Sequence, residues 1–406
     1  MPTAEPTPYK VSSGKATRRT PQPEEVEARV RQWLKEMHLG DTNPFQPWDA
    51  GADPNLSQYL VDHHVLDLLW HDSPTIVYAP AGGGKSAFRV RLAWACRVEE
   101  DQRRVFAISY VAPDPAATSL EAHLPAILRR AAQELLLALV HRPARFLGLS
   151  KADQESIRQT LDQNDPGLVK RFLPQLERVG GVGPLAESFD PSAAHLTKPA
   201  QPNDVRALCS ALAQMPAAHR VPPAIQRFEA LLDLLLGVLG FQAVYLLVDG
   251  VDAWLETQRR PDLAVAVLAP LLEHGADWST RQFFIKLFLP CELQKALPRR
   301  LTKGAQSAII RWDSKSLAEV LRQRLSAASG GGFDSLDAIS HPSLRGAEEE
   351  LLATIGPFPT PRELLVLVNQ IVVEHVLRDG QDCGLEPQDM QAAIMWYHSR
   401  ARPFRP

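Results

Sequence analysis

The sequence predicts an α/β protein with a three-layer α/β/α core around a parallel sheet, a helical insertion in that core, and a C-terminal helical lid domain. Three observations lead to this fold class. Apolar, β-branched runs alternate with helical patterns in the middle of the chain, a glycine-rich turn joins the first run to a helix, and only helical patterns follow the triple glycine at 330–332. Strands that alternate with helices favour a parallel sheet covered on both faces.

Length and composition are those of an ordinary globular protein. The chain has 406 residues, of which 45% are hydrophobic and 22% are charged, so it can bury a core without disulfide or metal cross-links. The formal net charge of -3 provides no global basic field, so charge does not support a nucleic-acid partner. We find no apolar leader and no apolar stretch of membrane-spanning length, and the four cysteines lie far apart. These features predict a cytoplasmic protein without a membrane segment.

The N-terminal region is predicted to contain a disordered tail and one amphipathic helix. Residues 1–22 are rich in Pro, Thr, Ser and Lys. Over residues 23–40, apolar side chains recur at helical spacing between Pro23, which suits a helix start, and Gly40, which suits a helix end. The apolar face of this helix either packs on the rest of the chain or docks a partner, and the pattern alone leaves both open.

Residues 41–330 are predicted to form the core. A helical and loop-rich insertion around residues 146–240 interrupts it, and its Gly-Gly-Val-Gly at 180–183 is a linker because no strand precedes it and no Lys-Ser follows. The helical patterns over residues 331–406 predict the lid domain, with the run Ser329 to Gly332 as a hinge. Short apolar runs predict the strands of the core over residues 75–78, 105–111, 243–248, 283–289 and 308–311.

The strongest motif is the glycine-rich turn Ala79-Pro80-Ala81-Gly82-Gly83-Gly84-Lys85-Ser86. It fits the phosphate-loop (Walker A) pattern GxxxxGK[ST], except that Ala79 replaces the first glycine at a position that serves mainly as a tight strand exit. Glycines let the backbone turn its N–H groups toward phosphate oxygens, and the helix that follows adds the positive end of its dipole. The motif therefore predicts ATP binding, with Lys85 on the β- and γ-phosphates and the Ser86 hydroxyl on Mg²⁺.

An acidic partner for this loop is predicted at the end of another strand. Asp249 directly follows the apolar run 244–248, which is the Walker B arrangement, and a carboxylate there can hold the water shell of Mg²⁺. Asp252 is the nearest downstream acid that could orient the attacking water, with Glu256 as a lesser candidate. No glutamate follows Asp249 immediately. The predicted catalytic set is Lys85, Asp249 and Asp252, and it supports nucleotide binding better than fast hydrolysis.

These motifs resemble those of P-loop NTPases. Lys85-Ser86 together with Asp249-Gly250-Val251-Asp252 is similar to the signal-transducing STAND branch of P-loop ATPases, whose second motif often reads DGxDE after an apolar run, and to the wider AAA+ and initiator-like ATPases. The resemblance covers roughly residues 41–330 and part of the helical region beyond. It implies a P-loop NTPase core, a helical lid, and bound ATP and Mg²⁺. The departure is Ala253, which stands where the STAND pattern has its glutamate.

The resemblance also indicates residues of the lid and of the strand ends. The segment Gly356-Pro357-Phe358-Pro359-Thr360-Pro361-Arg362 is similar to the lid segment of AAA+, STAND and KAP-type ATPases, which implies that Arg362 contacts the nucleotide phosphates; an ordinary helix start explains the proline before it equally well. An arginine of Pro298-Arg299-Arg300 would reach a neighbouring subunit in ring-forming relatives, and a solvated basic turn fits the same residues. Lys286 and Glu292, in and after one strand, give no clear γ-phosphate sensor.

Several functions fit these motifs. We expect an ATP-driven switch or remodelling ATPase that signals to a partner protein supplying an effector or a sensor, with a bacterial defence or signalling system as the setting by family analogy. Its hydrolysis would be slow without that partner. The alternatives are a nucleic-acid-associated initiator or loader, which the near-neutral charge disfavours, a P-loop kinase, for which we find no acceptor site, and a non-hydrolysing nucleotide-binding scaffold. An oligomer is compatible with the resemblance.

Overall fold

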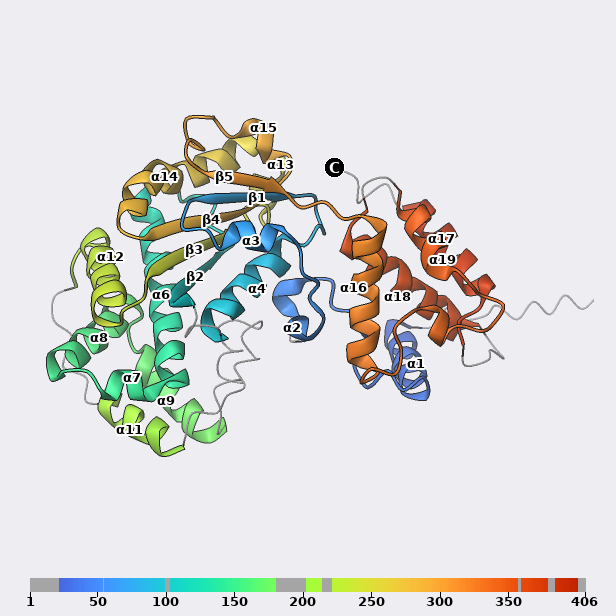
Figure 1. Ribbon diagram of the computed structural model, residues 1–406, viewed down its shortest axis with the longest axis horizontal. Helices are drawn as coiled ribbons and strands as arrows, with labels where there is room; N and C mark the ends of the chain where they lie inside the picture. The colour runs from blue at the N-terminus through green and yellow to red at the C-terminus, as the bar shows by residue number, and fades with distance from the viewer. Residues whose placement is uncertain are drawn as a thin grey trace, which may run out of the picture.

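The chain folds into two parts that lie side by side. The computed structural model describes residues 22–53, 55–98, 103–179, 202–213, 221–356, 359–378 and 384–400. An α/β core occupies the left of Figure 1, and a helical part occupies the right. The chain crosses from the core to the helical part at residues 310–313, directly after the last strand.

The core is built on a parallel sheet, and the strands predicted from the sequence form it. In the described residues the sheet has five strands in the order β2-β3-β4-β1-β5, each parallel to its neighbours. β1 and β3 are buried along their whole length, as expected for a parallel sheet covered on both faces. The strands are β1 (Thr75–Ala79), β2 (Val105–Val111), β3 (Ala243–Asp249), β4 (Phe283–Pro290) and β5 (Gln306–Ile309).

Helices cover both faces of this sheet, which confirms the predicted α/β class. Side chains of β1 alternate between the two faces: Val77 and Ala79 pack in the hydrophobic cluster of one face, and Ile76 and Tyr78 pack in that of the other. The helices of the first cluster are α3 (Val65–Leu69) and α4 (Lys85–Val98). Those of the second include α6 (Leu120–His141), α12 (Ala224–Asp233), α14 (Pro261–Thr280) and α15 (Leu293–Ala296), with α13 (Leu255–Arg259) next to α14.

The described residues of the predicted insertion are helical and share the hydrophobic cluster of α6. Its predicted linker at 180–183 lies outside the described residues. The longest apolar stretch of the chain is split between the π-helical turn η3 (Leu234–Val238) and β3, and no described helix has the length and apolar character needed to cross a bilayer. The insertion contains α7 (Pro143–Leu147), α8 (Lys151–Asn164), α9 (Leu168–Val179) and α11 (Pro202–Ala213).

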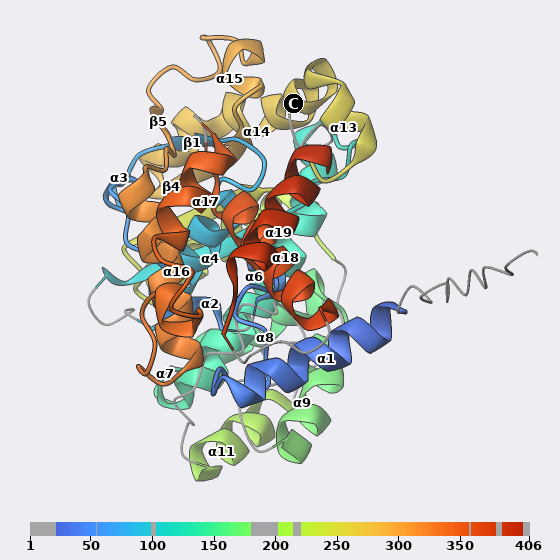
Figure 2. The same cartoon turned by 90° about the vertical axis from the view of Figure 1, so that its right-hand side faces the viewer.

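The helical part is formed by helices from both ends of the described chain. The predicted N-terminal helix is present as α1, and Figure 2 shows it below α18, on which it packs. Its apolar residues Val30, Trp33 and Leu34 are buried among the C-terminal helices, so this face packs within the chain. The helices are α1 (Pro23–Glu36), α16 (Ser314–Ala328), α17 (Ala347–Ile355), α18 (Pro361–Leu377) and α19 (Pro387–Arg400), with the short η4 (Asp337–Ile339). Between the two parts lie η1 (Ala50–Ala52), which packs on α4, and α2 (Leu56–Tyr59), which packs on α16.

Helix α16 lies outside the core that was predicted to extend to residue 330. Leu317, Leu321 and Leu325 of α16 are buried in the same hydrophobic cluster as the C-terminal helices. The glycine run predicted as the hinge therefore lies within the helical part, and the crossing between the parts is at residues 310–313. A periodic apolar face shows that a helix packs, but it does not show on which neighbour.

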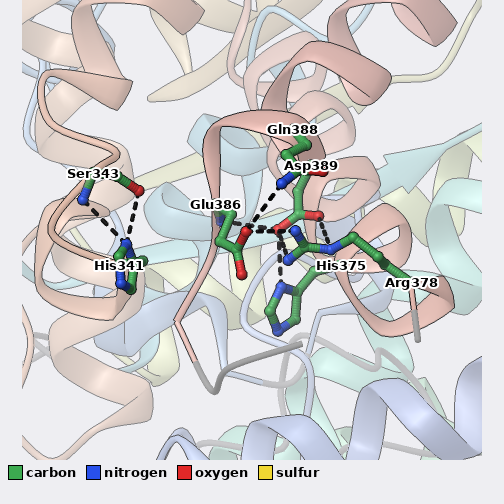
Figure 3. A network of polar contacts seen from close by, with 7 residues as sticks. All are labelled: His341, Ser343, His375, Arg378, Glu386, Gln388 and Asp389. Atoms are coloured by element: carbon green, nitrogen blue, oxygen red, sulfur yellow. Dashed lines mark hydrogen bonds and ion pairs between the residues drawn. The ribbon is translucent and has the colours of Figure 1, made fainter. Parts of the chain in front are cut away.

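A buried polar network joins α18 to α19 (Figure 3). His375 of α18 is fully buried, and its Nδ1 lies 2.9 Å from Asp389 Oδ2 of α19. Arg378 donates to Glu386 Oε2 at 2.5 Å and to Asp389 Oδ2 at 3.2 Å. The ring of Trp33 in α1 meets the His375 ring at 5.6 Å between centroids. The network thus ties three helices of the helical part into one unit.

Candidate functional site

The glycine-rich turn forms a tight loop between β1 and α4, at the carboxyl end of the sheet. Ala79 is the last residue of β1, and the Gly83 N–H donates to the carbonyl of Pro80 at 3.0 Å. Gly82 and Gly84 have backbone φ values of 74° and 94°, which residues with a side chain rarely adopt. At Gly83, an added Cβ would lie 3.0 Å from both Ala79 Cβ and the Pro80 oxygen. The backbone therefore favours glycine at 82 and 84, and a side chain at 83 would crowd the start of the loop.

Lys85 begins α4, and its side chain turns back over the loop. It is 8% exposed, and its Nζ donates to the carbonyl oxygens of Ala79 at 3.3 Å and of Pro80 at 3.5 Å. The same Nζ lies 3.6 Å from Asp252 Oδ2. Ser86 follows in α4 and is half-buried. The loop, its lysine and Asp252 thus meet at the carboxyl end of the sheet.

Asp249 ends β3 and is buried beside an arginine of α4. Its Oδ1 accepts the Gly250 N–H at 2.8 Å, and its Oδ2 accepts from Arg89 Nε at 3.2 Å. Arg89 Nη1 also donates to Ser109 Oγ of β2 at 3.2 Å. The side chains of Arg89 and Asp249 are only 4% and 3% exposed. Removing either partner would leave a buried charge without compensation, which is strongly destabilising.

The helical part touches the loop through the first turn of α18. The Arg362 N–H donates to the Gly82 carbonyl at 3.4 Å, and an added Cβ on Gly82 would lie 2.6 Å from Arg362 Cβ. The helix begins here because Thr360 Oγ1 accepts the Glu363 N–H at 3.2 Å and Pro361 occupies the first turn. The first turn of α18 is therefore an ordinary helix start, and its residue Arg362 also contacts the loop. Within the described residues, the guanidinium of Arg362 has no hydrogen bond or ion pair.

Trp312, in the crossing between the two parts, makes a second contact with the loop. Its Nε1 donates to the Gly83 carbonyl at 3.0 Å. The Trp312 ring lies 6.3 Å from the Phe88 ring and 5.6 Å from the His63 ring, between centroids. His63 Nε2 lies 3.2 Å from the Arg311 carbonyl, and burial lowers the pKa of His63. A neutral His63 that donates from Nε2 explains both observations, and these rings form an aromatic wall beside the loop.

Polar contacts fasten the segment before β1 to the helical part. Arg324 of α16 donates to the Pro44 carbonyl at 2.8 Å and to Asp53 Oδ2 at 3.2 Å, and the Asp53 side chain is completely buried. Asn43 Nδ2 donates to Asn369 Oδ1 of α18 at 2.8 Å. Because η1 in the same segment packs on α4, these contacts hold the helical part next to the loop.

Lys286, by contrast, lies away from the loop. Lys286 pairs with Thr75 at the amino end of β1, opposite the loop, and its Nζ donates to the His71 carbonyl at 2.5 Å and the Ser73 carbonyl at 2.8 Å. Burial lowers the pKa of Lys286 to about 7. Glu292 is exposed just past the carboxyl end of β4, where the neighbouring Cys291 N–H donates to the Ala79 carbonyl at 3.2 Å. The two arginines at 299 and 300 are exposed in a turn.

The residues predicted to bind Mg²⁺ have suitable ligand atoms, but some of these atoms already make other contacts. The Ser86 hydroxyl and the Asp249 carboxylate are oxygen ligands of the type that Mg²⁺ prefers. The Asp249 oxygens, however, already accept from Gly250 and Arg89. Over the described ranges, no group of three or more His, Cys, Asp or Glu side chains is arranged to hold a metal ion. A metal ion at Asp249 would therefore share an oxygen that Arg89 already contacts.

Arg89 and Trp312 are site residues that the sequence motifs did not indicate. A charged residue in an amphipathic helix usually faces solvent, so the sequence pattern predicts an exposed side chain for Arg89. Its signal is its spacing: Arg89 lies four residues after Lys85, so both side chains share the face of α4 that points to the loop and to β3. Trp312 has no comparable signal, because its role depends on where the crossing between the two parts runs.

The arrangement is suited to binding an anion. The loop backbone turns around the start of the 14-residue helix α4, and the side chains of Lys85 and Arg362 add positive charge beside it.

No protein-family model matches the chain, and a search of the curated proteins likewise finds no match.

Proposed function

We propose that the chain binds ATP at the loop of residues 79–86 and acts as a nucleotide-dependent switch that signals to a partner protein. The observation that carries the proposal is the position of Arg362. The first turn of a helix from the helical part lies directly on Gly82 of a glycine-rich loop whose Lys85 begins the next helix. Phosphates bound at this loop would lie where the two parts meet, so their number can bias how the parts fit together.

The sheet supports a core of the P-loop NTPase type. Ligands of open parallel sheets bind beyond the carboxyl ends of the strands. β1 leads into the loop and β3 ends at Asp249, and both strands end at the same edge of the sheet with β4 between them. The resemblance of the two motifs to STAND and AAA+-like ATPases is therefore matched by a suitable arrangement of elements.

The side chains at the loop support slow hydrolysis of a bound ATP. Lys85 would give up part of its contact with Asp252 to bind a phosphate oxygen, and the Asp252 carboxylate would then accept a proton or a water hydrogen bond. Asp249 is engaged by Arg89, and Ala253 stands where the resemblance implies a glutamate. Hydrolysis without a partner is therefore proposed to be slow.

A second candidate is a static nucleotide-binding scaffold. The observation that favours it is the set of buried contacts from Arg324 to Pro44 and Asp53, which hold the two parts together without any contribution from the loop. A scaffold would bind nucleotide at the same place and keep one shape.

Small-angle scattering separates the two candidates. The full chain is compared without nucleotide, with ADP and with a non-hydrolysable ATP analogue, and Arg362→Ala is compared with Arg299→Ala, which removes an exposed arginine. The switch predicts a profile specific to the ATP analogue in the wild type and in Arg299→Ala, and its loss in Arg362→Ala, because differential contacts must drive the change. Identical profiles in all three states would favour the scaffold.

A further inference from the structure

We infer that Arg89 supplies from within the chain the positive charge that a metal ion would bring, so that nucleotide binds at the loop with an affinity that hardly depends on Mg²⁺. The inference rests on the proposed ATP site. It starts from a mismatch at Asp249: the residue type suits a metal ion, whereas its contacts are those of a buried ion pair.

Arg89 is held in place from three sides. Helix α4 carries it on the same face as Lys85, four residues further along. Its Nε donates to Asp249 Oδ2 at 3.2 Å on β3, and its Nη1 donates to Ser109 Oγ at 3.2 Å on β2. With 4% of its side chain exposed, the guanidinium is buried in the core.

The Asp249 carboxylate already has a cation beside it, and two of its roughly four acceptor sites are occupied. Its Oδ1 accepts the Gly250 N–H at 2.8 Å, and its Oδ2 accepts from Arg89. A Mg²⁺ ion binds through one or two carboxylates and keeps several waters, so it needs these oxygens as acceptors. It would also stand close to a guanidinium, which repels a divalent cation in a buried site of low dielectric. Freeing the carboxylate would require breaking a buried ion pair, which is costly.

The fixed charges at the loop suit a nucleotide that carries no metal. Lys85, Arg89 and Arg362 contribute three positive charges near the loop, and Asp249 and Asp252 contribute two negative ones. Because Arg89 compensates Asp249, the carboxylate does not repel the phosphates and no metal ion is needed to screen it. Metal-free ATP, which is more negative than its Mg²⁺ complex, is therefore accommodated.

Calorimetry on the full chain tests the inference. ATP is titrated into the wild type in buffer with excess Mg²⁺ and in buffer with EDTA. We expect the two dissociation constants to agree within about threefold, which is well under the 1.4 kcal/mol of a tenfold change. Binding in Mg²⁺ with at least tenfold weaker binding in EDTA would overturn the inference and leave the proposed ATP site intact. The absence of binding in both buffers would overturn both.

Two variants assign the effect to Arg89. Arg89→Met frees the Asp249 carboxylate, so its affinity for ATP should become at least about tenfold weaker in EDTA than in Mg²⁺. Arg91→Met removes a partly exposed arginine from the same helix and should keep the wild-type ratio. An unchanged ratio in a folded Arg89→Met protein would overturn the role of Arg89. If Arg89→Met fails to fold, the wild-type affinities in Mg²⁺ and in EDTA still test whether ATP binding depends on the metal ion.

Discussion

Replacing Gly82 by alanine tests the contact between the loop and the helical part. The φ value of Gly82 is +74°, and a Cβ at this position would lie 2.6 Å from Arg362 Cβ and 3.1 Å from Arg362 Cδ. Non-bonded carbon atoms prefer separations of about 3.5–4.0 Å, so the closest pair would be roughly 1 Å too near. A Cβ atom cannot rotate away from its own backbone, and so the first turn of α18 must move.

The expected cost has two components. Alanine in the left-handed region costs about 1–2 kcal/mol at any position. The clash with Arg362 adds about 1–3 kcal/mol, the usual cost of overpacking a tight contact. Gly304→Ala is the matched control, because its φ of +82° carries the first cost while no atom lies within 4 Å of the added Cβ.

Hydrogen–deuterium exchange of peptides from the start of α18 measures the second component directly. Gly82→Ala should speed their exchange by about 5- to 150-fold, since each tenfold change in the opening equilibrium is about 1.4 kcal/mol. Gly304→Ala should leave them unchanged. Adding Arg362→Gly to Gly82→Ala should restore slow exchange, whereas adding Arg362→Ala should not, because the clashing Cβ remains. Equal exchange in Gly82→Ala and Gly304→Ala would refute the contact.

Two further predictions concern stability. Arg324→Met leaves the buried Asp53 carboxylate without its cation, so urea titrations should show a free energy of unfolding lower by about 3–5 kcal/mol. The control is Arg322→Met, which breaks a more exposed ion pair with Glu319 on the same helix and should cost at most about 1 kcal/mol. Burial lowers the pKa of Lys286 from 10.5 to about 7, so from pH 7 toward 10 the unfolded chain binds more protons than the folded chain and stability gains with pH. Urea midpoints at pH 7, 8 and 9 should therefore rise in the wild type relative to Lys286→Met; parallel curves would contradict this reading.

The sheet and the loop could be predicted because local patterns determine them. β1 and β3 are short apolar runs buried on both faces, and the loop needs glycines whose φ values only glycine adopts readily. The strand β5 is the least regular: it covers residues 306–309, two residues before the run predicted at 308–311. It lies at the edge of the sheet and is only partly buried, so its apolar pattern is weaker.

The contacts between distant segments could not be predicted in the same way. The apolar face of α16 has the same period whether it packs on the core or on α18, and only the folded chain shows the choice. Lys286 sits in a strand that leads toward the site, yet its side chain is used at the opposite end of the sheet. Arg89 pairs with Asp249 across 160 residues of sequence, and one sequence carries no record of such a pairing.

Calorimetric titration of ATP into Lys85→Ala and Asp252→Asn tests the central claim most directly, because the two variants remove opposite members of one ion pair. If Lys85 binds phosphate, Lys85→Ala loses a charge-assisted contact worth about 1.5–3 kcal/mol and should bind ATP at least tenfold more weakly than the wild type. Asp252→Asn keeps the shape of the side chain and releases Lys85, so it should bind ATP at least as tightly as the wild type. Equal affinities for the wild type and Lys85→Ala, or an equal loss in the two variants, would contradict a nucleotide site at this loop.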